Sequence, residues 1–181
     1  VSFHTIVEFH PENFLYQSTI TVPGYTGSST LTNFPVLVRL AENSPAGFHY
    51  ADCAADGSDL RFADAAGTMI ASEIEHWDVA GTSCVWVTVG ALVGTDTSFT
   101  LYYGAYKNAL ATDPLAVGAI WTNAAYCGVW HCETNTAAGT ITESANGLVS
   151  GLTNSSAFSF PGGKTGGGVV DAVAGFADGE G

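Results

Sequence analysis

Apolar and polar side chains alternate most regularly in the middle of the chain, between Asp59 and Gly104. Valine occupies every second position of residues 85–89, and Phe, Leu and Tyr do so in residues 99–103. Alternate side chains share one face of a strand, so both segments predict strands with one face on a core. Turn-forming segments lie between the predicted strands at residues 64–67, 80–83 and 94–97. Connections this short favour consecutive antiparallel strands.

The same alternation predicts two earlier strands, at residues 19–22 and 34–40, around a turn-rich segment. The apolar face of the second predicted strand consists of Phe34, Val36, Val38 and Leu40. The chain also has 22 glycines and few segments with helical periodicity, which is typical of an all-β protein. We therefore expect an antiparallel, jelly-roll-like β-sandwich.

The first ten residues form a separate strand pattern that ends at Pro11. Its apolar face consists of Val1, Phe3, Thr5, Val7 and Phe9. A lone strand leaves its backbone groups and its apolar face unpaired in water. The segment is therefore expected to join a sheet, either in its own molecule or in a neighbouring one.

These patterns divide the chain into four parts. The predicted parts are an N-terminal extension (1–12), a β-sandwich domain (13–106), a linker (107–118) and a C-terminal segment (119–181). In the last part the composition changes to Gly, Ala, Thr and Asn, and strands are expected near residues 127–131 and 158–160.

Composition excludes several classes of function. Four basic and seventeen acidic residues give a formal net charge of −13, which argues against binding to a nucleic-acid backbone. No apolar segment approaches the roughly 18 residues that cross a bilayer. Because the chain opens on Val1 without a signal peptide, we interpret it as a processed mature terminus or an excised fragment.

Four cysteines occur, at positions 53, 84, 127 and 132, without CxxC spacing. In a β protein with few lysines, disulfides formed in an oxidising compartment are favoured over a zinc site. This predicts a secreted or cell-surface protein. Three pairings are open, and the one that we favour joins Cys53 to Cys84 and Cys127 to Cys132.

The segment from Tyr16 to Gly104 resembles a bacterial family of unknown function that occurs in large secreted and surface proteins. The matching motifs are TIT (19–21), NFPVLVRL (33–40), DLRF (59–62), DAAG (64–67), EIEHW (73–77), VWV (85–87) and YYG (102–104). The sequence departs from the family at Gly90, where proline is usual, and at Ala105, where asparagine is usual. The resemblance implies a β-sandwich, and it supplies no catalytic residue.

Members of that family often precede a concanavalin A-like, laminin G-type domain. GVWHCE at residues 128–133 resembles the opening of such a domain. About 50 residues follow it, fewer than the roughly 100 of a complete sandwich. Residues 119–181 are therefore expected to be a partial concanavalin A-like segment.

One acidic motif raises the question of catalysis. Glu73, Glu75 and Asp78 form E-x-E-x-x-D, which is similar to the strand pattern of jelly-roll glycosidases. Two carboxyl groups about 5–5.5 Å apart can support retaining hydrolysis. Because the family resemblance accounts for EIEHW without catalysis, we predict no enzyme activity and no catalytic residue.

No metal site is predicted. Asp52, Asp56, Asp59 and Asp64 surround Gly57, and such oxygen-rich loops can hold Ca²⁺, but their spacing matches no EF-hand. We favour a solvated acidic loop and leave Ca²⁺ as an unassigned alternative. The five histidines show no metal-binding spacing.

Two tryptophans, Trp77 and Trp121, are candidates for stacking against sugar rings, although tryptophans in a sandwich are more often core or edge residues. Asn154 begins an N-x-S/T sequence and is a candidate for glycosylation in an exposed loop.

The N-terminal strand suggests how the protein functions. If it fills the open edge of the next copy, the contact runs head to tail and builds a fibre. We therefore expect a structural subunit of an extracellular filament or surface appendage, with copies of itself as partners. The alternative is a carbohydrate-binding or adhesive module of a larger secreted surface protein, with glycans as partners.

Overall fold

The computed structural model describes residues 9–106, 119–122 and 126–131, together with the backbone of four short strands between residues 140 and 171. The chain divides into two compact units, Val1–Asn123 and Ala124–Gly181. No helix in these described parts is long and apolar enough to cross a membrane.

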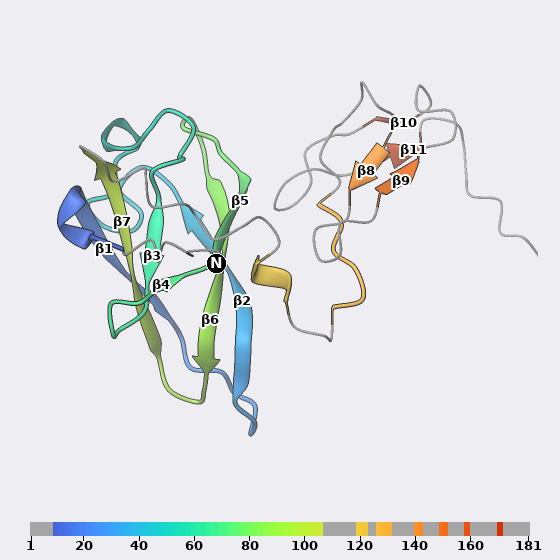
Figure 1. Cartoon of the computed structure of the whole chain (residues 1–181), viewed down its shortest axis with the longest axis horizontal. Coiled ribbons are helices and arrows are strands. Elements are labelled where there is room, and N and C mark those ends of the chain that lie inside the picture. Colours follow the sequence, from blue (N-terminus) through green and yellow to red (C-terminus); the bar gives the residue numbers. More distant parts are fainter. Residues whose placement is uncertain are drawn as a thin grey trace, which may run out of the picture. The chain divides into compact units, whose positions relative to one another are not determined.

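The described part of the first unit is a β-sandwich of two antiparallel sheets, which are drawn as two layers in Figure 1. One sheet has the order β1 (Phe14–Val22), β7 (Thr97–Ala105), β3 (Arg61–Ala63) and β4 (Met69–Ile70). The other has the order β2 (Leu31–Leu40), β6 (Ser83–Leu92) and β5 (Ser72–His76). Short 3₁₀ helices occur at η1 (Pro11–Asn13), η2 (Tyr50–Asp52) and η4 (Ala119–Trp121). The predicted all-β sandwich is confirmed.

The alternation in the sequence marks the face of each strand that is buried. Val85 and Val87 of β6 and Leu101 of β7 have no exposed surface. They pack in one apolar cluster between the sheets, together with Val38, Phe62 and the other inward side chains. Burial of each such side chain contributes roughly 1.5–3 kcal/mol, so these strands anchor the fold.

The prediction that consecutive strands pair with each other is wrong for β6 and β7. Residues 93–96 connect them, but β6 belongs to the three-stranded sheet and β7 pairs with β1 and β3. Packed sheets lie only about 10 Å apart, so a short loop can cross between layers as well as form a hairpin. Both strands still bury their apolar faces in the same core.

A single buried carboxylate connects three parts of the sandwich. Asp59 is 3% exposed and precedes β3. Its Oδ2 accepts hydrogen bonds from the backbone N–H groups of Gly104 (2.9 Å) and Ala105 (3.1 Å) at the end of β7. Its Oδ1 accepts one from Ala54 (2.8 Å). Gly104 has a positive φ of 71°, so the strand bends here and turns its N–H groups toward Asp59.

In the second unit, β8 (Thr140–Thr142) pairs with β9 (Val149–Gly151) and β10 (Phe158–Ser159) pairs with β11 (Val170–Asp171). The strand expected near Phe158 is therefore present. The strand expected at residues 127–131 is not, because Trp130 is the only residue of that range in a β-bridge. Successive residues of a ladder are needed to form a strand, and the sequence pattern does not reveal their partners.

Replacing Asp59 by alanine is expected to destabilise the sandwich by about 3 kcal/mol or more. The change leaves three backbone N–H groups without their acceptor, and an unsatisfied buried donor costs roughly 1–3 kcal/mol. Urea denaturation measures the free energy of unfolding. The control is Asp56→Ala, which removes an exposed carboxylate that accepts one N–H bond, from Ser58. Equal losses for the two variants would contradict the assigned role of Asp59.

Candidate functional site

A groove lies between β1 and β2 at one side of the sandwich. The two strands are consecutive in the chain but belong to different sheets, and each is the outermost strand of its sheet among the described residues. The groove has a volume of about 360 Å³. Its apolar lining consists of Ile20, Val22, Pro23, Val36, Leu37, Val38 and Pro45.

The apolar core is accessible from this groove. Ile20, Val22 and Val36 are only partly buried, yet they pack against the fully buried cluster. In the middle of a sheet, such side chains are flanked on both sides by side chains of the neighbouring strands. Since no described strand lies beyond β1 or β2, the groove combines open backbone edges with exposed core side chains.

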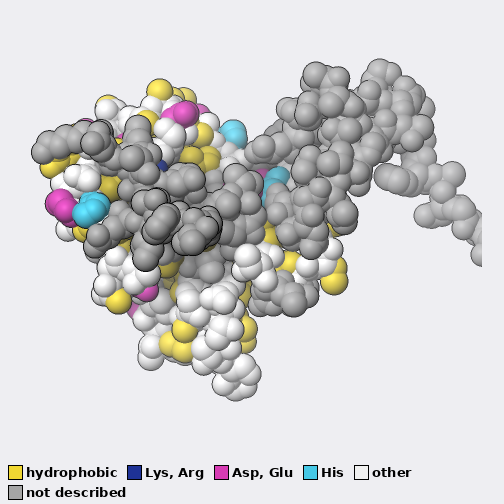
Figure 2. Space-filling model, viewed as in Figure 1, with side chains coloured by type: hydrophobic (Ala, Val, Ile, Leu, Met, Phe, Trp, Pro, Cys, Tyr) yellow, Lys and Arg dark blue, Asp and Glu magenta, His cyan; other side chains and the backbone are white. Residues whose placement is uncertain are grey.

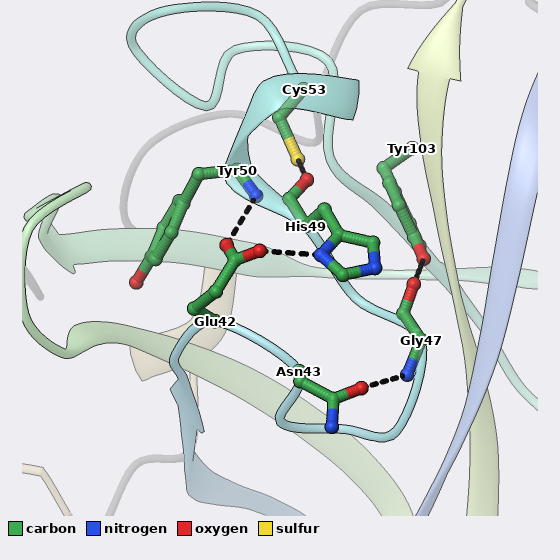
Figure 3. Close-up of polar contacts among 7 residues, drawn as sticks. All are labelled: Glu42, Asn43, Gly47, His49, Tyr50, Cys53 and Tyr103. Carbon is green, nitrogen blue, oxygen red and sulfur yellow. Dashed lines mark hydrogen bonds and ion pairs between the residues drawn. The ribbon is translucent and has the colours of Figure 1, made fainter.

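The loop after β2 forms one end of the groove through Ser44 and Pro45. Figure 3 shows its internal contacts. The Asn43 side chain accepts a hydrogen bond from the Gly47 N–H (2.9 Å), and the Gly47 carbonyl accepts one from the Tyr103 hydroxyl (3.1 Å). The Tyr103 hydroxyl also contacts Ser18 of β1 (3.4 Å). The loop is thus fixed to β7 through Tyr103, which also contacts β1.

An ion pair closes the base of this loop. The Glu42 carboxylate contacts the His49 ring and accepts a hydrogen bond from the Tyr50 N–H (3.3 Å; Figure 3). The hydrogen bond with Glu42 raises the pKa of His49 above its usual value, and desolvation offsets part of that rise. The contact with His49, followed by the Tyr50 N–H, lowers the pKa of Glu42. Both side chains are exposed, so the pair orders the loop at its surface.

The described end of the N-terminal segment packs within its own chain. The Phe9 ring lies 5.3 Å from Tyr102 and 5.9 Å from Phe14, measured between ring centroids. Phe9 precedes η1 and is not part of a strand. Four of the predicted interface residues, Val1, Phe3, Thr5 and Val7, lie outside the described residues.

The candidate carboxylates of the EIEHW motif lie on the outer face of β5. The Trp86 indole N–H donates to Glu75 (3.0 Å), and the Trp121 indole N–H donates to Glu73 (2.9 Å). The two indole rings meet edge to face at 5.4 Å. Asp78 lies in the turn after β5 and accepts the Ala80 N–H (3.0 Å). The structure thus engages the two glutamates with tryptophans and uses Asp78 to stabilise a turn.

Both tryptophans that were candidates for sugar stacking are engaged inside the first unit. Trp121 is 6% exposed, and η4, which carries it, packs on β2, β5 and β6. Trp77 is half-buried, and its indole N–H donates to the Ala55 carbonyl (3.0 Å). The Trp77 ring also covers Gly57, where a Cβ would lie 2.8 Å from it. Gly57 therefore leaves room for the Trp77 ring.

The acidic residues around Gly57 use their oxygens separately. Asp56 Oδ1 accepts the Ser58 N–H (3.0 Å), and Asp64 Oδ1 accepts the N–H groups of Ala66 and Thr68 (2.9 Å each). Asp59 is buried at the contact described above. Among the described residues, no three His, Cys, Asp or Glu side chains converge on a point where a metal ion could bind.

The predicted Cys53–Cys84 disulfide is not formed. Cys53, Cys84 and Cys127 are free thiols, and Cys132 is not among the described residues. The Cys53 thiol contacts the His49 carbonyl (3.7 Å), while Cys84 lies buried in the middle strand of its sheet, opposite Arg39 and His76. Asn154, the glycosylation candidate, also lies outside the described residues.

The described part of the first unit is an all-β sandwich with a groove between β1 and β2. Residues 56–131 match the model of a family described as a domain of unknown function, DUF2341. This match covers β3 to β7 and η4, and it excludes β1 and β2, which line the groove. No curated protein and no solved structure matches the chain.

Cys53 is expected to react far more slowly with iodoacetamide than Cys127. Burial, followed by the charges of Asp59 and Asp52, raises the pKa of Cys53 to about 12. At pH 8 this leaves about one thiol in 10⁴ as the reactive thiolate. Cys127 is exposed. Mass spectrometry of the reduced protein after timed labelling measures both rates, and rapid modification of Cys53 in the folded protein would disprove its burial.

The imidazole of His49 is expected to titrate above pH 6.5, and Glu42→Gln should return its pKa toward 6.5. The stabilisation from the raised His49 pKa is complete below 6.5 and is lost as the pH rises through the folded-state pKa. The stabilisation from the lowered Glu42 pKa is present above 4.5 and is lost as the pH falls through its folded-state value. The pair therefore stabilises the loop between these limits. NMR titration of the wild type and of Glu42→Gln tests this, and equal His49 pKa values in the two proteins would contradict the assigned pair.

Proposed function

We propose that the chain is a structural subunit of an extracellular filament or surface appendage, in which a strand from one copy fills the groove of the next. The groove between the open edges of β1 and β2 is the observation that carries this proposal. An added strand supplies hydrogen bonds to an edge and apolar side chains to the groove. These are the two things that this side of the sandwich lacks.

The alternating segment before Phe9 is the strand that we assign as the donor. Phe9 packs on Tyr102, which belongs to β7, one strand inward from the β1 edge. Phe9 thus packs against the β1 and β7 strands of its own subunit. This contact fixes the end of the donor segment to its own subunit, and in the proposed assembly the donor itself lies on the β1 edge of another copy.

The donor and the groove are different surfaces of one subunit. A contact between them is head-to-tail, so it propagates into a fibre unless the copies close into a ring. Three large apolar side chains, Val1, Phe3 and Val7, alternate along the donor. At roughly 1.5–3 kcal/mol for each one buried, these side chains supply several kcal/mol per joint.

Charge sets the conditions for assembly. Each copy carries a formal charge of −13. On the face drawn in Figure 2, acidic side chains appear at several places on the described surface and Lys or Arg side chains hardly at all. Copies therefore repel one another at low salt. Physiological salt weakens this repulsion, because it screens charges that are separated by more than about 8 Å. Assembly should strengthen as salt is added.

A carbohydrate-binding function has less support. The tryptophans that it requires, Trp77 and Trp121, already contact their own chain through their rings and their indole N–H groups. A sugar would need an exposed ring face on which to stack.

The full chain is expected to form filaments in physiological salt, visible by negative-stain microscopy, and Phe3→Asp combined with Val7→Asp should abolish them. The two substitutions place charges where apolar groups enter the groove, which is strongly unfavourable. Ser2→Asp is the matched control, because it adds charge on the opposite side of the same strand. Circular dichroism checks that all variants are folded.

Filaments that persist in the double variant would exclude the N-terminal strand as the donor. A wild-type chain that remains monomeric at all concentrations, by analytical ultracentrifugation, would show that the segment completes its own sandwich instead.

A further inference from the structure

We infer that β1 is the edge that receives the partner strand and that β2 is closed to strand addition. This inference rests on the proposed function, since both edges border the same groove, and it identifies the surface that the partner occupies. It follows from the direction of backbone groups along the two strands.

The first step fixes where the backbone of Pro35 points. In an antiparallel strand, the N–H and C=O of one residue point to the same neighbour, and those of the next residue point to the other. The Thr88 N–H donates to Ala71, on the β5 side of β6 (3.0 Å). Thr88 therefore turns its backbone away from β2. Its partner in the register is Pro35, so the backbone of Pro35 points away from β6, toward the open edge.

The consequence is that the β2 edge lacks a donor at its centre. Proline has no N–H, and its ring occupies the space where a neighbouring strand would approach. The edge is also irregular at Asn33, which has a positive φ of 48° and is skipped in the register with β6. Arg39 adds an exposed charged residue near the other end. Prolines, irregularities and charges are the devices that protect edge strands in natural sheets.

The β1 edge carries neither a proline nor a charge, and its one irregularity, at Leu15, lies near the start of the strand, where the register with β7 skips it. Its nine residues, FLYQSTITV, include no proline, glycine or charged residue. The register with β7 is continuous from Tyr16 to Val22, so the strand is regular over seven residues. Leu15 is 64% exposed on this strand. A long, regular, uncharged edge of this kind is a template for another strand.

The groove lies directly inside this edge. Ile20 and Val22 point inward from β1, and Val36 and Val38 face them from β2. A strand hydrogen-bonded to β1 would direct every second side chain into this apolar space. The Val1, Phe3, Thr5 and Val7 positions of a second copy have that spacing.

The test uses the full chain carrying Phe3→Asp and Val7→Asp, which cannot act as a donor but keeps its groove. A synthetic peptide of residues 1–8 is added, and amide hydrogen exchange is followed residue by residue by NMR. With peptide bound, alternate amides of Tyr16–Val22 are expected to exchange at about one tenth of their rate in the free protein, or more slowly still. Addition of a strand to β1 pairs every second N–H, which protects it from exchange. The amides of β2 should be unaffected.

Protection of β2 in place of β1 would overturn the inference while leaving strand complementation intact. Failure of the peptide to bind at all would instead refute the proposed function, and with it this inference. A peptide with Asp at positions 3 and 7 is the negative control and should protect neither edge.

A second variant tests why β2 is closed. Pro35→Val, added to the donor-disabled chain, restores an N–H on the open edge without removing a hydrogen bond to β6. Circular dichroism checks that this variant, at a buried position, is still folded, and part of the bound peptide should now protect amides of β2. If β2 remains unprotected in this variant, Pro35 is not what closes that edge, and the argument from backbone direction fails.

Discussion

The N–H and C=O groups of an outermost strand have no partner on one side, and this constraint governs the side of the sandwich where the groove lies. β1 and β2 follow one another in the chain, yet they enter different sheets and become the outermost strand of each. Their open edges therefore lie on either side of one gap. The gap also exposes Ile20, Val22 and Val36, which would otherwise complete the core. Unpaired backbone groups of the edge strands and incompletely buried apolar side chains thus occur at the same place.

Away from the groove, buried hydrogen bonds and packing contacts join the parts of the sandwich. Asp59 and Gly104 belong to the DLRF and YYG sequences, 45 residues apart, and they meet through the hydrogen bond from the Gly104 N–H to Asp59. In the EIEHW sequence, Trp77 covers Gly57 and Glu75 accepts the Trp86 N–H. These motifs lie within the residues that match the uncharacterised family, so buried contacts account for them. The strands that border the groove, β1 and β2, lie outside that match.

Alternation alone predicted β1, β2, β6 and β7, because a side chain at every second position must face either the core or the solvent. It identified the inward faces of β6 and β7 correctly. It did not assign the strands to sheets, since a loop such as 93–96 can form a hairpin or cross between layers. The groove depends on that assignment, so Ile20, Val22 and Pro45 were not recognised as site residues. Glu42 and His49 were missed for a related reason: only the folded loop brings them together.

The difference between the β1 and β2 edges affects whether an assembly of subunits grows in one direction or in several. If both edges accepted strands equally, each subunit could add neighbours on both sheets, and growth would produce irregular aggregates. Pro35, Asn33 and Arg39 make one edge unfavourable, whereas the register of β1 is uninterrupted from Tyr16 to Val22. One donor and one acceptor per subunit allow growth in a single direction only. In the proposed assembly, Pro35 thus has a clear physical role: it contributes no hydrogen bond to β6, and it leaves the other side of β2 without an N–H donor where a second subunit would otherwise add a strand.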